Sequence, residues 1–371
     1  MARVVSGSHT DDLLTVRVKH RLQRIELDVD VAVRREVMAV VGPSGAGKTS
    51  VLRAVAGLLR PDKARIEYAG RTLVDTERRV SLPPESRGVG MMFQDGALFP
   101  HLSIARNIEY GLRPRPRGRR ERRARVAELL ARYGIQELAA ARPGKASGGE
   151  RQRAALARAV AATPDILLLD EPLSALDSVT KARVSRELAQ WLAELSLPTI
   201  LVSHDYGDVV GLADRIAVID EGKVVQVGTA ADLMRAPASP FVAAFVGTNC
   251  FTGVARRDGR LTEVTVPGGA RFSITTPASG KVSVVVDPWA VRLISPATAP
   301  AGPNTVHGLV TQTVPLGSRI RVTLGSDPPF IAEIPAEQAA GFDLSRGAFA
   351  AATWSPEAIR VITDERPPPT G

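Results

Sequence analysis

Alternating apolar and polar residues near the start of the chain predict β-strands, and continuous apolar runs further along predict buried ones. The stretches Leu13–His20 and Ile25–Val33 alternate with the two-residue period of a strand that has one buried face. The runs Val37–Val41, Ile166–Asp170 and Thr199–Ser203 lack this alternation and are typical of strands buried on both faces. Helical patterns separate the runs, so the sequence favours an α/β domain with a largely parallel central sheet.

Turn and helix signals complete the pattern of this first domain. A helix is predicted at Ser50–Leu59, and it should end near Pro61 because proline disfavours helical geometry in the residue before it. From about 102 to 141 the pattern is mainly helical and highly charged. Two short strands, Ile216–Ile219 and Lys223–Val227, flank a turn sequence and indicate a hairpin.

The pattern changes near residue 245. The remaining residues show short strands joined by segments rich in proline, glycine and alanine, which predicts an all-β domain and favours a small barrel. We therefore expect two domains, at 1–245 and 246–371, with a helical subdomain at about 95–160 and a disordered tail. The expected strands of the second domain are Val282–Val286, Gly308–Thr313, Arg319–Leu324, Phe330–Ile334, Ala348–Trp354 and Ile359–Ile362.

The composition supports a globular protein of the cytoplasm. Of the 371 residues, 44% are hydrophobic and 23% are charged, which excludes a wholly disordered chain. No apolar run approaches the roughly 20 residues of a membrane-spanning helix, and the first residues lack the apolar segment of an export signal. Cys250 is the single cysteine, so an internal disulfide and a cysteine-cluster zinc site are excluded.

The positive charge is confined to one segment. Arg113–Arg125 holds eight Arg and one Glu, an excess of 8 − 1 = +7, which leaves 9 − 7 = +2 of the net charge of +9 for all other residues. Nucleic-acid surfaces usually interleave basic residues with aromatic rings, and this segment has none. A solvated loop leading into a helix, a protein contact and a contact with anionic lipid all remain open.

A glycine-rich loop directly after the first continuous apolar run, Val37–Val41, carries the clearest chemistry. The sequence fits G-x-x-x-x-G-K-[ST], in which glycines let backbone N–H groups converge on phosphate oxygens at the start of a helix. The lysine can reach the β- and γ-phosphates, and the threonine hydroxyl can bind Mg²⁺. The expected phosphate-binding residues are Gly42, Pro43, Ser44, Gly45, Ala46, Gly47, Lys48, Thr49 and Ser50.

A second buried strand ends in two carboxylates. Asp170 closes the run Ile166–Asp170, at the edge of the sheet where it can hold a metal ion. Glu171 follows and can polarise an attacking water as general base. Phosphoryl transfer depends on alignment and charge neutralisation, so the glycine-rich loop and these two carboxylates together predict a nucleoside triphosphatase.

Further motifs resemble those of the ATP-binding-cassette (ABC) ATPases. Ala146–Glu150 resembles the signature motif of that family, Gln94 lies in a segment similar to its Q-loop, Ser174–Asp177 resembles its D-loop, and His204 its switch histidine. The motifs occur in the family's order across residues 37–205, and the resemblance extends to about residue 245.

The resemblance implies a head-to-tail homodimer that binds two ATP molecules with Mg²⁺ between its subunits. Ser147, Gly148 and Gly149 begin a helix and would close on the γ-phosphate held by the opposite subunit, while Asp177 would contact the partner's site. The catalytic residues implied are Glu171, His204 and Lys48, and the metal-binding residues implied are Thr49, Gln94 and Asp170.

Two departures from the family pattern stand out. The signature motif has Ala146 and Glu150 where the family usually has Leu and Gln, but its central Ser-Gly-Gly is intact. The family also stacks adenine on an aromatic ring ahead of the glycine-rich loop, and no aromatic residue precedes Tyr68. His20 or Arg24 can replace that ring, with apolar contact from Ile25.

Longer stretches resemble one branch of the family. Leu82–Gly111 is similar to the corresponding segment of bacterial molybdate-importer ATPases, and Val306–Gln312 and Trp354–Ala358 resemble the oligomer-binding-type domain of importer ATPases. The resemblance implies an α/β P-loop domain with a helical subdomain, followed by an all-β regulatory domain.

The function that follows from this resemblance is the ATP-hydrolysing subunit of a bacterial importer, for molybdate or a related oxyanion. Its implied partners are integral membrane permease subunits and, through them, an extracytoplasmic substrate-binding protein, which places the chain at the cytoplasmic face of the membrane. Importers of sulfate, iron, polyamines or sugars remain open, as does a soluble ABC ATPase acting on nucleic acid or ribosomes.

Overall fold

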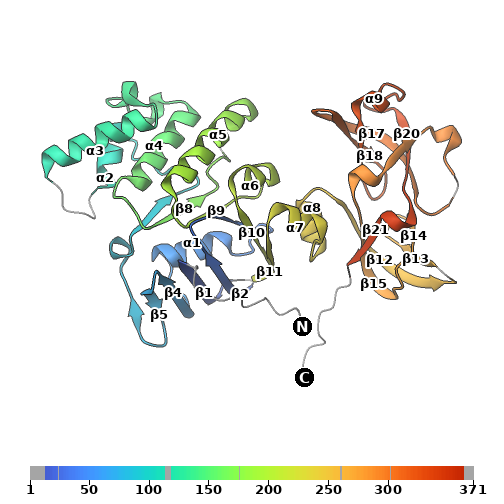
Figure 1. Ribbon diagram of the computed structural model, residues 1–371, viewed down its shortest axis with the longest axis horizontal. Coiled ribbons are helices and arrows are strands. Elements are labelled where there is room, and N and C mark those ends of the chain that lie inside the picture. The colour runs from blue at the N-terminus through green and yellow to red at the C-terminus, as the bar shows by residue number, and fades with distance from the viewer. Residues whose placement is uncertain are drawn as a thin grey trace. The chain divides into compact units, whose positions relative to one another are not determined.

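The chain forms two compact units in the computed structural model (Figure 1), unit 1 (Met1–Ala230) and unit 2 (Ala231–Gly371). The structure describes residues 13–23, 25–112, 118–174, 176–259, 261–300 and 302–362. Arg24, Ala175, the first part of the basic segment (113–117) and the tail expected to be disordered lie outside these residues. The expected domain division at 245/246 stays a prediction.

Within the described residues, an eleven-stranded sheet organises unit 1, in the order β6-β5-β4-β1-β2-β11-β10-β3-β9-β8-β7. Its central strands β10, β3, β9, β8 and β7 are parallel, and β6, β5, β4, β1 and β2 form an antiparallel wing. The strands are β1 (Leu14–Arg21), β2 (Glu26–Val33), β3 (Val37–Val41), β4 (Lys63–Tyr68), β5 (Arg71–Asp75), β6 (Val80–Ser81), β7 (Val89–Met92), β8 (Ile166–Asp170), β9 (Thr199–Val202), β10 (Arg215–Asp220) and β11 (Lys223–Gly228).

Helices cover both faces of this sheet and create two cores. In β8, Ile166 and Leu168 belong to the core that contains α1, whereas Leu167 and Leu169 belong to the core that contains α2, α3, α4 and α5. This confirms the prediction of strands buried on both faces. The helices are α1 (Lys48–Ala56), α2 (Ile104–Tyr110), α3 (Arg119–Arg132), α4 (Gly148–Val160), α5 (Ser178–Leu195) and α6 (Tyr206–Leu212), with α7 (Ala230–Arg235) following.

The first helix ends earlier than its sequence pattern predicts. We expected it to run to Leu59, but α1 ends at Ala56 because Gly57 adopts a left-handed conformation with φ of 84°. Glycine takes this conformation without the steric cost that a side chain adds, so it ends helices efficiently. Pro61 therefore lies beyond the end of the helix and does not set it.

In its described residues, unit 2 contains two five-stranded antiparallel sheets, β14-β13-β12-β15-β21 and β16-β20-β17-β18-β19, which enclose one apolar core. The all-β fold class is confirmed, but hydrogen bonding divides the strands between two sheets where the pattern favoured one barrel. The elements are α8 (Pro240–Phe245), β12 (Asn249–Asp258), β13 (Leu261–Thr265), β14 (Arg271–Ile274), β15 (Gly280–Val286), β16 (Arg292–Ile294), β17 (Thr305–Leu316), β18 (Arg319–Gly325), β19 (Phe330–Pro335), α9 (Ala336–Ala339), β20 (Phe349–Thr353) and β21 (Ile359–Ile362).

Two buried asparagines join the sheets of unit 2. The Asn249 side chain donates to the carbonyl oxygen of Ile331 at 2.8 Å and accepts from its N–H at 2.7 Å. The Asn304 side chain makes the same pair of bonds to Ser273, each of 2.9 Å. Buried amides satisfied in this way fix how the two sheets face each other, because an unpaired buried amide is costly.

Among the described helices, none is long and apolar enough to span a lipid bilayer.

Arg87 is a buried cation that binds the C-terminal end of α1. Only 3% of the residue is exposed, and burial lowers its pKa. Its guanidinium donates to the carbonyl oxygens of Ala54 and Val55 at the end of α1 (2.7 and 3.0 Å) and to that of Leu82 (2.8 Å). A cation at this end of the helix also complements the helix dipole, so Arg87 anchors the helix that carries the glycine-rich loop.

We predict that Arg87→Met weakens the anchoring of α1. The substitution removes the donors to three buried carbonyl oxygens and should lower the free energy of opening of α1 by about 2–4 kcal/mol, since hydrogen bonds from charged groups contribute roughly 1.5–3 kcal/mol each and rarely add fully. Hydrogen exchange of α1 amides measures this change. Exposed Arg35→Met is the control, and equal protection in the two variants would contradict the anchoring role.

Candidate functional site

The loop between β3 and α1 has the backbone that a phosphate site requires. Gly45 and Gly47 have φ of 84° and 96°, in the left-handed region. At Gly42, an added Cβ would lie 2.0 Å from the carbonyl oxygen of Ile219, so no side chain fits. These glycines let the loop curl tightly against β10 before α1 begins at Lys48.

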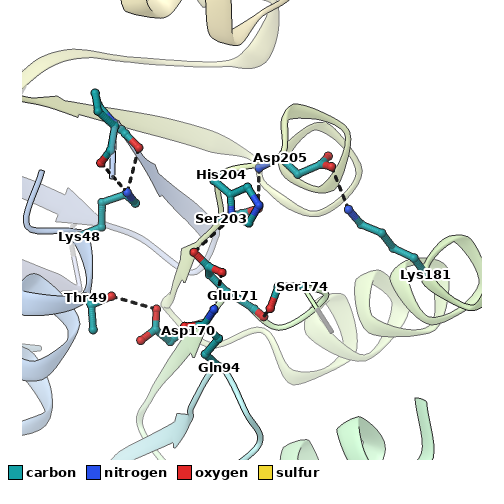
Figure 2. Close-up of polar contacts among 12 residues, drawn as sticks. Lys48, Thr49, Gln94, Asp170, Glu171, Ser174, Lys181, Ser203, His204 and Asp205 are labelled. Atoms are coloured by element: carbon teal, nitrogen blue, oxygen red, sulfur yellow. Dashed lines mark hydrogen bonds and ion pairs between the residues drawn. The ribbon is translucent and has the colours of Figure 1, made fainter. Parts of the chain in front are cut away.

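The Lys48 side chain folds back on this loop. Its Nζ donates to the carbonyl oxygens of Gly42 and Pro43, both at 2.9 Å (Figure 2). Burial lowers the pKa of Lys48, and the charges of Glu171 and Asp170 oppose that shift. The loop, the lysine and the two carboxylates predicted from the sequence therefore act electrostatically on one another.

Thr49 and Asp170 form the next part of the site. The Thr49 hydroxyl donates to Oδ1 of Asp170 over 3.3 Å. Asp170 is 6% exposed, and burial raises its pKa against the effect of the Thr49 bond. Within the described part of the chain Asp170 forms no direct ion pair, although the charges of Arg53 and Lys48 act to lower its pKa. The Thr49 and Asp170 oxygens are donors of the kind that suit a divalent cation.

Glu171 lies at the centre of the polar cluster in Figure 2. Its Oε2 accepts from the Gln94 side-chain amide at 2.9 Å, and its Oε1 lies 3.2 Å from Nδ1 of His204. The backbone N–H of Glu171 donates to the carbonyl oxygen of Val202 in β9. The backbone of Glu171 has φ of 47°, in the left-handed region. For a non-glycine residue this conformation costs about 1 kcal/mol, and such strain tends to occur at functional sites.

Gln94 therefore meets Glu171 in this structure. The resemblance implies that Gln94 binds metal together with Thr49 and Asp170. Among the described residues, Gln94 forms no hydrogen bond with either of them. His204 follows β9 directly, and its side chain is 64% exposed. Gln94, Glu171 and His204 lie more than 30 residues apart in sequence, and the ends of β7, β8 and β9 bring them together.

The signature segment forms a capped helix start. Ser147 is the N-cap of α4, and its hydroxyl accepts from the N–H of Glu150 while the Glu150 carboxylate accepts from the N–H of Ser147 at 2.7 Å. The bond from the Ser147 N–H lowers the pKa of Glu150. Glu150 thus satisfies one N–H of the turn, which explains how a glutamate is accommodated where the family usually has glutamine.

Asp177 caps the following helix, since its Oδ1 accepts from the N–H of Thr180 at 3.1 Å. Within the described residues, Ser147 forms no hydrogen bond or ion pair with Lys48, Glu171 or His204. One chain therefore presents two separate groups of candidate residues.

A third group lies at the turn between β1 and β2. His20, Leu22 and Ile25 border a cavity of about 650 Å³. Nδ1 of His20 is 3.0 Å from Oδ2 of Asp62, and Leu22 lies beside Gly47 of the glycine-rich loop. Leu22 thus lies beside the loop, and His20, proposed from the sequence as a base-contacting residue, borders the same cavity as Leu22. Arg24, the other candidate, lies outside the described residues.

Three charged residues that the sequence analysis did not single out, Lys181, Asp205 and Asp208, lie at or beside the His204 turn. Nζ of Lys181 lies 2.9 Å from Oδ2 of Asp205 and 2.9 Å from Oδ1 of Asp208. No local signal marks Lys181, because its partners belong to the next helix along the chain. Asp205 has a signal, since aspartate directly before a helix is a common N-cap.

Comparison with known proteins agrees with the motifs. The family model described as "ABC transporter" matches residues 22–174. The chain is 36% identical over 308 residues to the molybdenum import ATP-binding protein ModC of Mycobacterium tuberculosis, covering 82% of this chain and 84% of that protein. It is 38% identical to the spermidine/putrescine import ATP-binding protein PotA 1 of Pseudomonas aeruginosa, covering 82% and 83%.

A third relative, the sulfate/thiosulfate import ATP-binding protein CysA 2 of Chromobacterium violaceum, is 40% identical over 78% of this chain and 76% of that protein. Among solved structures, the dimeric structure of MJ0796, described as a bacterial ABC transporter cassette, is 26% identical with a TM-score of 0.50, covering 58% of this chain and 98% of that one. By identity and coverage, this chain belongs to the ABC transporter family and is an ABC-type ATPase.

Proposed function

We propose that this chain is the ATP-hydrolysing, energy-coupling subunit of a bacterial ABC importer for molybdate or a related oxyanion. The observation that carries the proposal is the cluster in which Gln94 and His204 both contact Glu171, next to Asp170 and the glycine-rich loop. The relatives support an importer, and their names include molybdenum, polyamine and sulfate transport.

In this proposal the loop from Gly42 to Ser50 binds the phosphates of ATP through backbone N–H groups, and Lys48 moves from its carbonyl partners to the β- and γ-phosphates. Thr49 and Asp170 hold Mg²⁺, with Gln94 able to reach the ion if it leaves Glu171. The ion supplies charge neutralisation at the phosphates. Within the described residues no group of three or more His, Cys, Asp or Glu side chains is placed to hold a metal ion, so phosphate oxygens and water would have to supply the remaining ligands.

Glu171 accepts the proton of the attacking water as general base. Its carboxylate is only 19% exposed, and Gln94 and His204 restrict its orientation. His204 is exposed enough to reach the γ-phosphate, which is its proposed role as sensor. Base contacts come from His20 and Ile25, which border one cavity with Leu22, and from Leu22, which lies beside Gly47 of the loop.

The complete site in this proposal needs two copies of the chain. The start of α4, with Ser147, Gly148 and Gly149, does not contact the Lys48 group within the described residues, so it is available to close on nucleotide held by a partner. The MJ0796 cassette was solved as a dimer. Integral membrane permease subunits and an extracytoplasmic substrate-binding protein complete the proposed importer, at the cytoplasmic face of the membrane.

We predict that Glu171→Gln keeps ATP binding but lowers hydrolysis by at least about a hundredfold, because an amide cannot act as general base. The variant should accumulate as a nucleotide-bound dimer, measured by phosphate release and by size-exclusion chromatography with light scattering in Mg-ATP. Exposed Glu85→Gln should behave as wild type. Unchanged turnover in Glu171→Gln would refute the assignment.

We predict that Lys48→Ala weakens ATP binding by roughly ten- to a hundredfold, since the variant loses charge-assisted hydrogen bonds to phosphate. Isothermal titration calorimetry measures the dissociation constant. Lys223→Ala, an exposed lysine on β11, is the matched control. Normal affinity in Lys48→Ala would contradict the phosphate site.

The transported solute is tested with the permease and binding protein reconstituted in proteoliposomes. We predict that binding protein loaded with molybdate stimulates ATP hydrolysis more than the same protein offered sulfate, iron, a polyamine or a sugar. Stimulation by another solute would replace molybdate in the proposal. Strongly salt-dependent binding of RNA or DNA without any stimulation would favour the soluble ABC ATPase instead.

A further inference from the structure

The exposed side chain of His204 is not held in place by packing, so other contacts must fix its position. The imidazole is 64% exposed, and its recorded contact is the one to Glu171. An exposed side chain that must meet a carboxylate at 3.2 Å depends on the backbone that carries it. The turn Ser203–Asp205 is that backbone, and the N–H of Asp205 donates to the Ser203 hydroxyl at 3.1 Å.

Lys181 holds this turn from the neighbouring helix. Its Nζ donates to Oδ2 of Asp205 at 2.9 Å (Figure 2) and lies 2.9 Å from Oδ1 of Asp208. The other oxygen of Asp205 caps α6 by accepting from the N–H of Asp208. Asp205 therefore uses one oxygen to start α6 and the other to bind α5.

The two ion pairs of Lys181 differ in burial, since the Asp205 side chain is 43% exposed and the Asp208 pair is largely shielded from water. The Lys181 and Asp208 side chains are 25% and 10% exposed. Burial acts to lower the pKa of Lys181, but its hydrogen bonds to Asp208 and Asp205 outweigh that effect and raise it. Burial raises the pKa of Asp208, and the bond from Lys181 opposes this. Removing one partner of such a group leaves the other partly buried charge uncompensated.

Lys181 also links two candidate segments. Its backbone N–H donates to the carbonyl oxygen of Asp177 at 2.8 Å, in the first turn of α5. Asp177 caps that turn. Lys181 therefore contacts the Asp177 segment through its backbone and the His204 turn through its side chain.

We propose that Lys181 is a positioning residue for ATP hydrolysis: by binding Asp205 and Asp208 together, it holds the His204 turn so that the imidazole meets Glu171. This inference rests on the proposed roles of Glu171 and His204, and goes beyond them by naming what orients His204.

The first test is Lys181→Met, which keeps the length of the side chain without its charge. Its kcat should fall roughly ten- to a hundredfold, as expected when a catalytic group is displaced. The dissociation constant for Mg-ATP should be unchanged, because the glycine-rich loop is untouched. Lys181→Arg should restore most of kcat. Arg186→Met, an exposed arginine on α5, is the matched control and should leave kcat unchanged.

A second variant keeps the proposal testable if Lys181→Met does not fold. Asp205→Asn keeps an oxygen that can cap α6, since asparagine is a strong N-cap, but it cannot bind Lys181 as an anion. Its kcat should fall as in Lys181→Met, and the double variant should fall no further. If Lys181→Met does not fold, the kcat of Asp205→Asn alone tests the positioning role. Wild-type kcat in a folded Lys181→Met or Asp205→Asn variant overturns the proposal.

A cycle with His204→Ala shows whether Lys181 acts through the histidine. In the His204→Ala background, Lys181→Met should add little further loss of kcat, since residues that act as one unit are not additive. If the fold losses of kcat in Lys181→Met and His204→Ala multiply in the double variant, the proposal is overturned. Glu171→Gln and His204→Ala are measured in the same assay: if both keep wild-type hydrolysis, the proposed reaction centre fails and Lys181 has nothing to position. If they lose hydrolysis while Lys181→Met does not, the positioning role alone fails.

Discussion

The parallel register of β3, β9 and β8 is the constraint on which the candidate site depends. Asp170 pairs with Val202, and Val202 in turn pairs with Val40. The segments that leave these strands therefore start at nearly the same level of the sheet edge. A shift by one residue would turn Glu171 away and reverse which apolar side chains face each core, so the two cores of unit 1 protect the register and the chemistry together.

The same packing explains the electrostatics of the site. The charged groups at the ends of strands buried on both faces lie in partly desolvated surroundings. Charges interact more strongly there than in water. Lys48 and Asp170 both have pKa values shifted towards their neutral forms by burial. In the proposed function, Mg-ATP would relieve both costs at once, because its phosphates would face Lys48 and its cation would face Asp170.

The sequence predicted the elements that have strong local signals. Continuous apolar runs identified β3 and β8 to the residue, and glycine spacing identified the loop before α1. The second domain was predicted only in part: the strands before Val282 were missed, although Asp258-Gly259 is a hairpin turn signal. The contact of Lys181 with Asp205 could not be predicted, because it joins two helices 24 residues apart and depends on how they pack.

The left-handed backbone of Glu171 has an evolutionary consequence. Glycine would relieve the strain at this position, so selection for thermal robustness alone would favour losing the carboxylate. Under the proposed function, selection for the general base keeps a glutamate there. In copies of this gene freed from that demand, position 171 should be among the first in unit 1 to drift, well before the apolar residues on either side of β8.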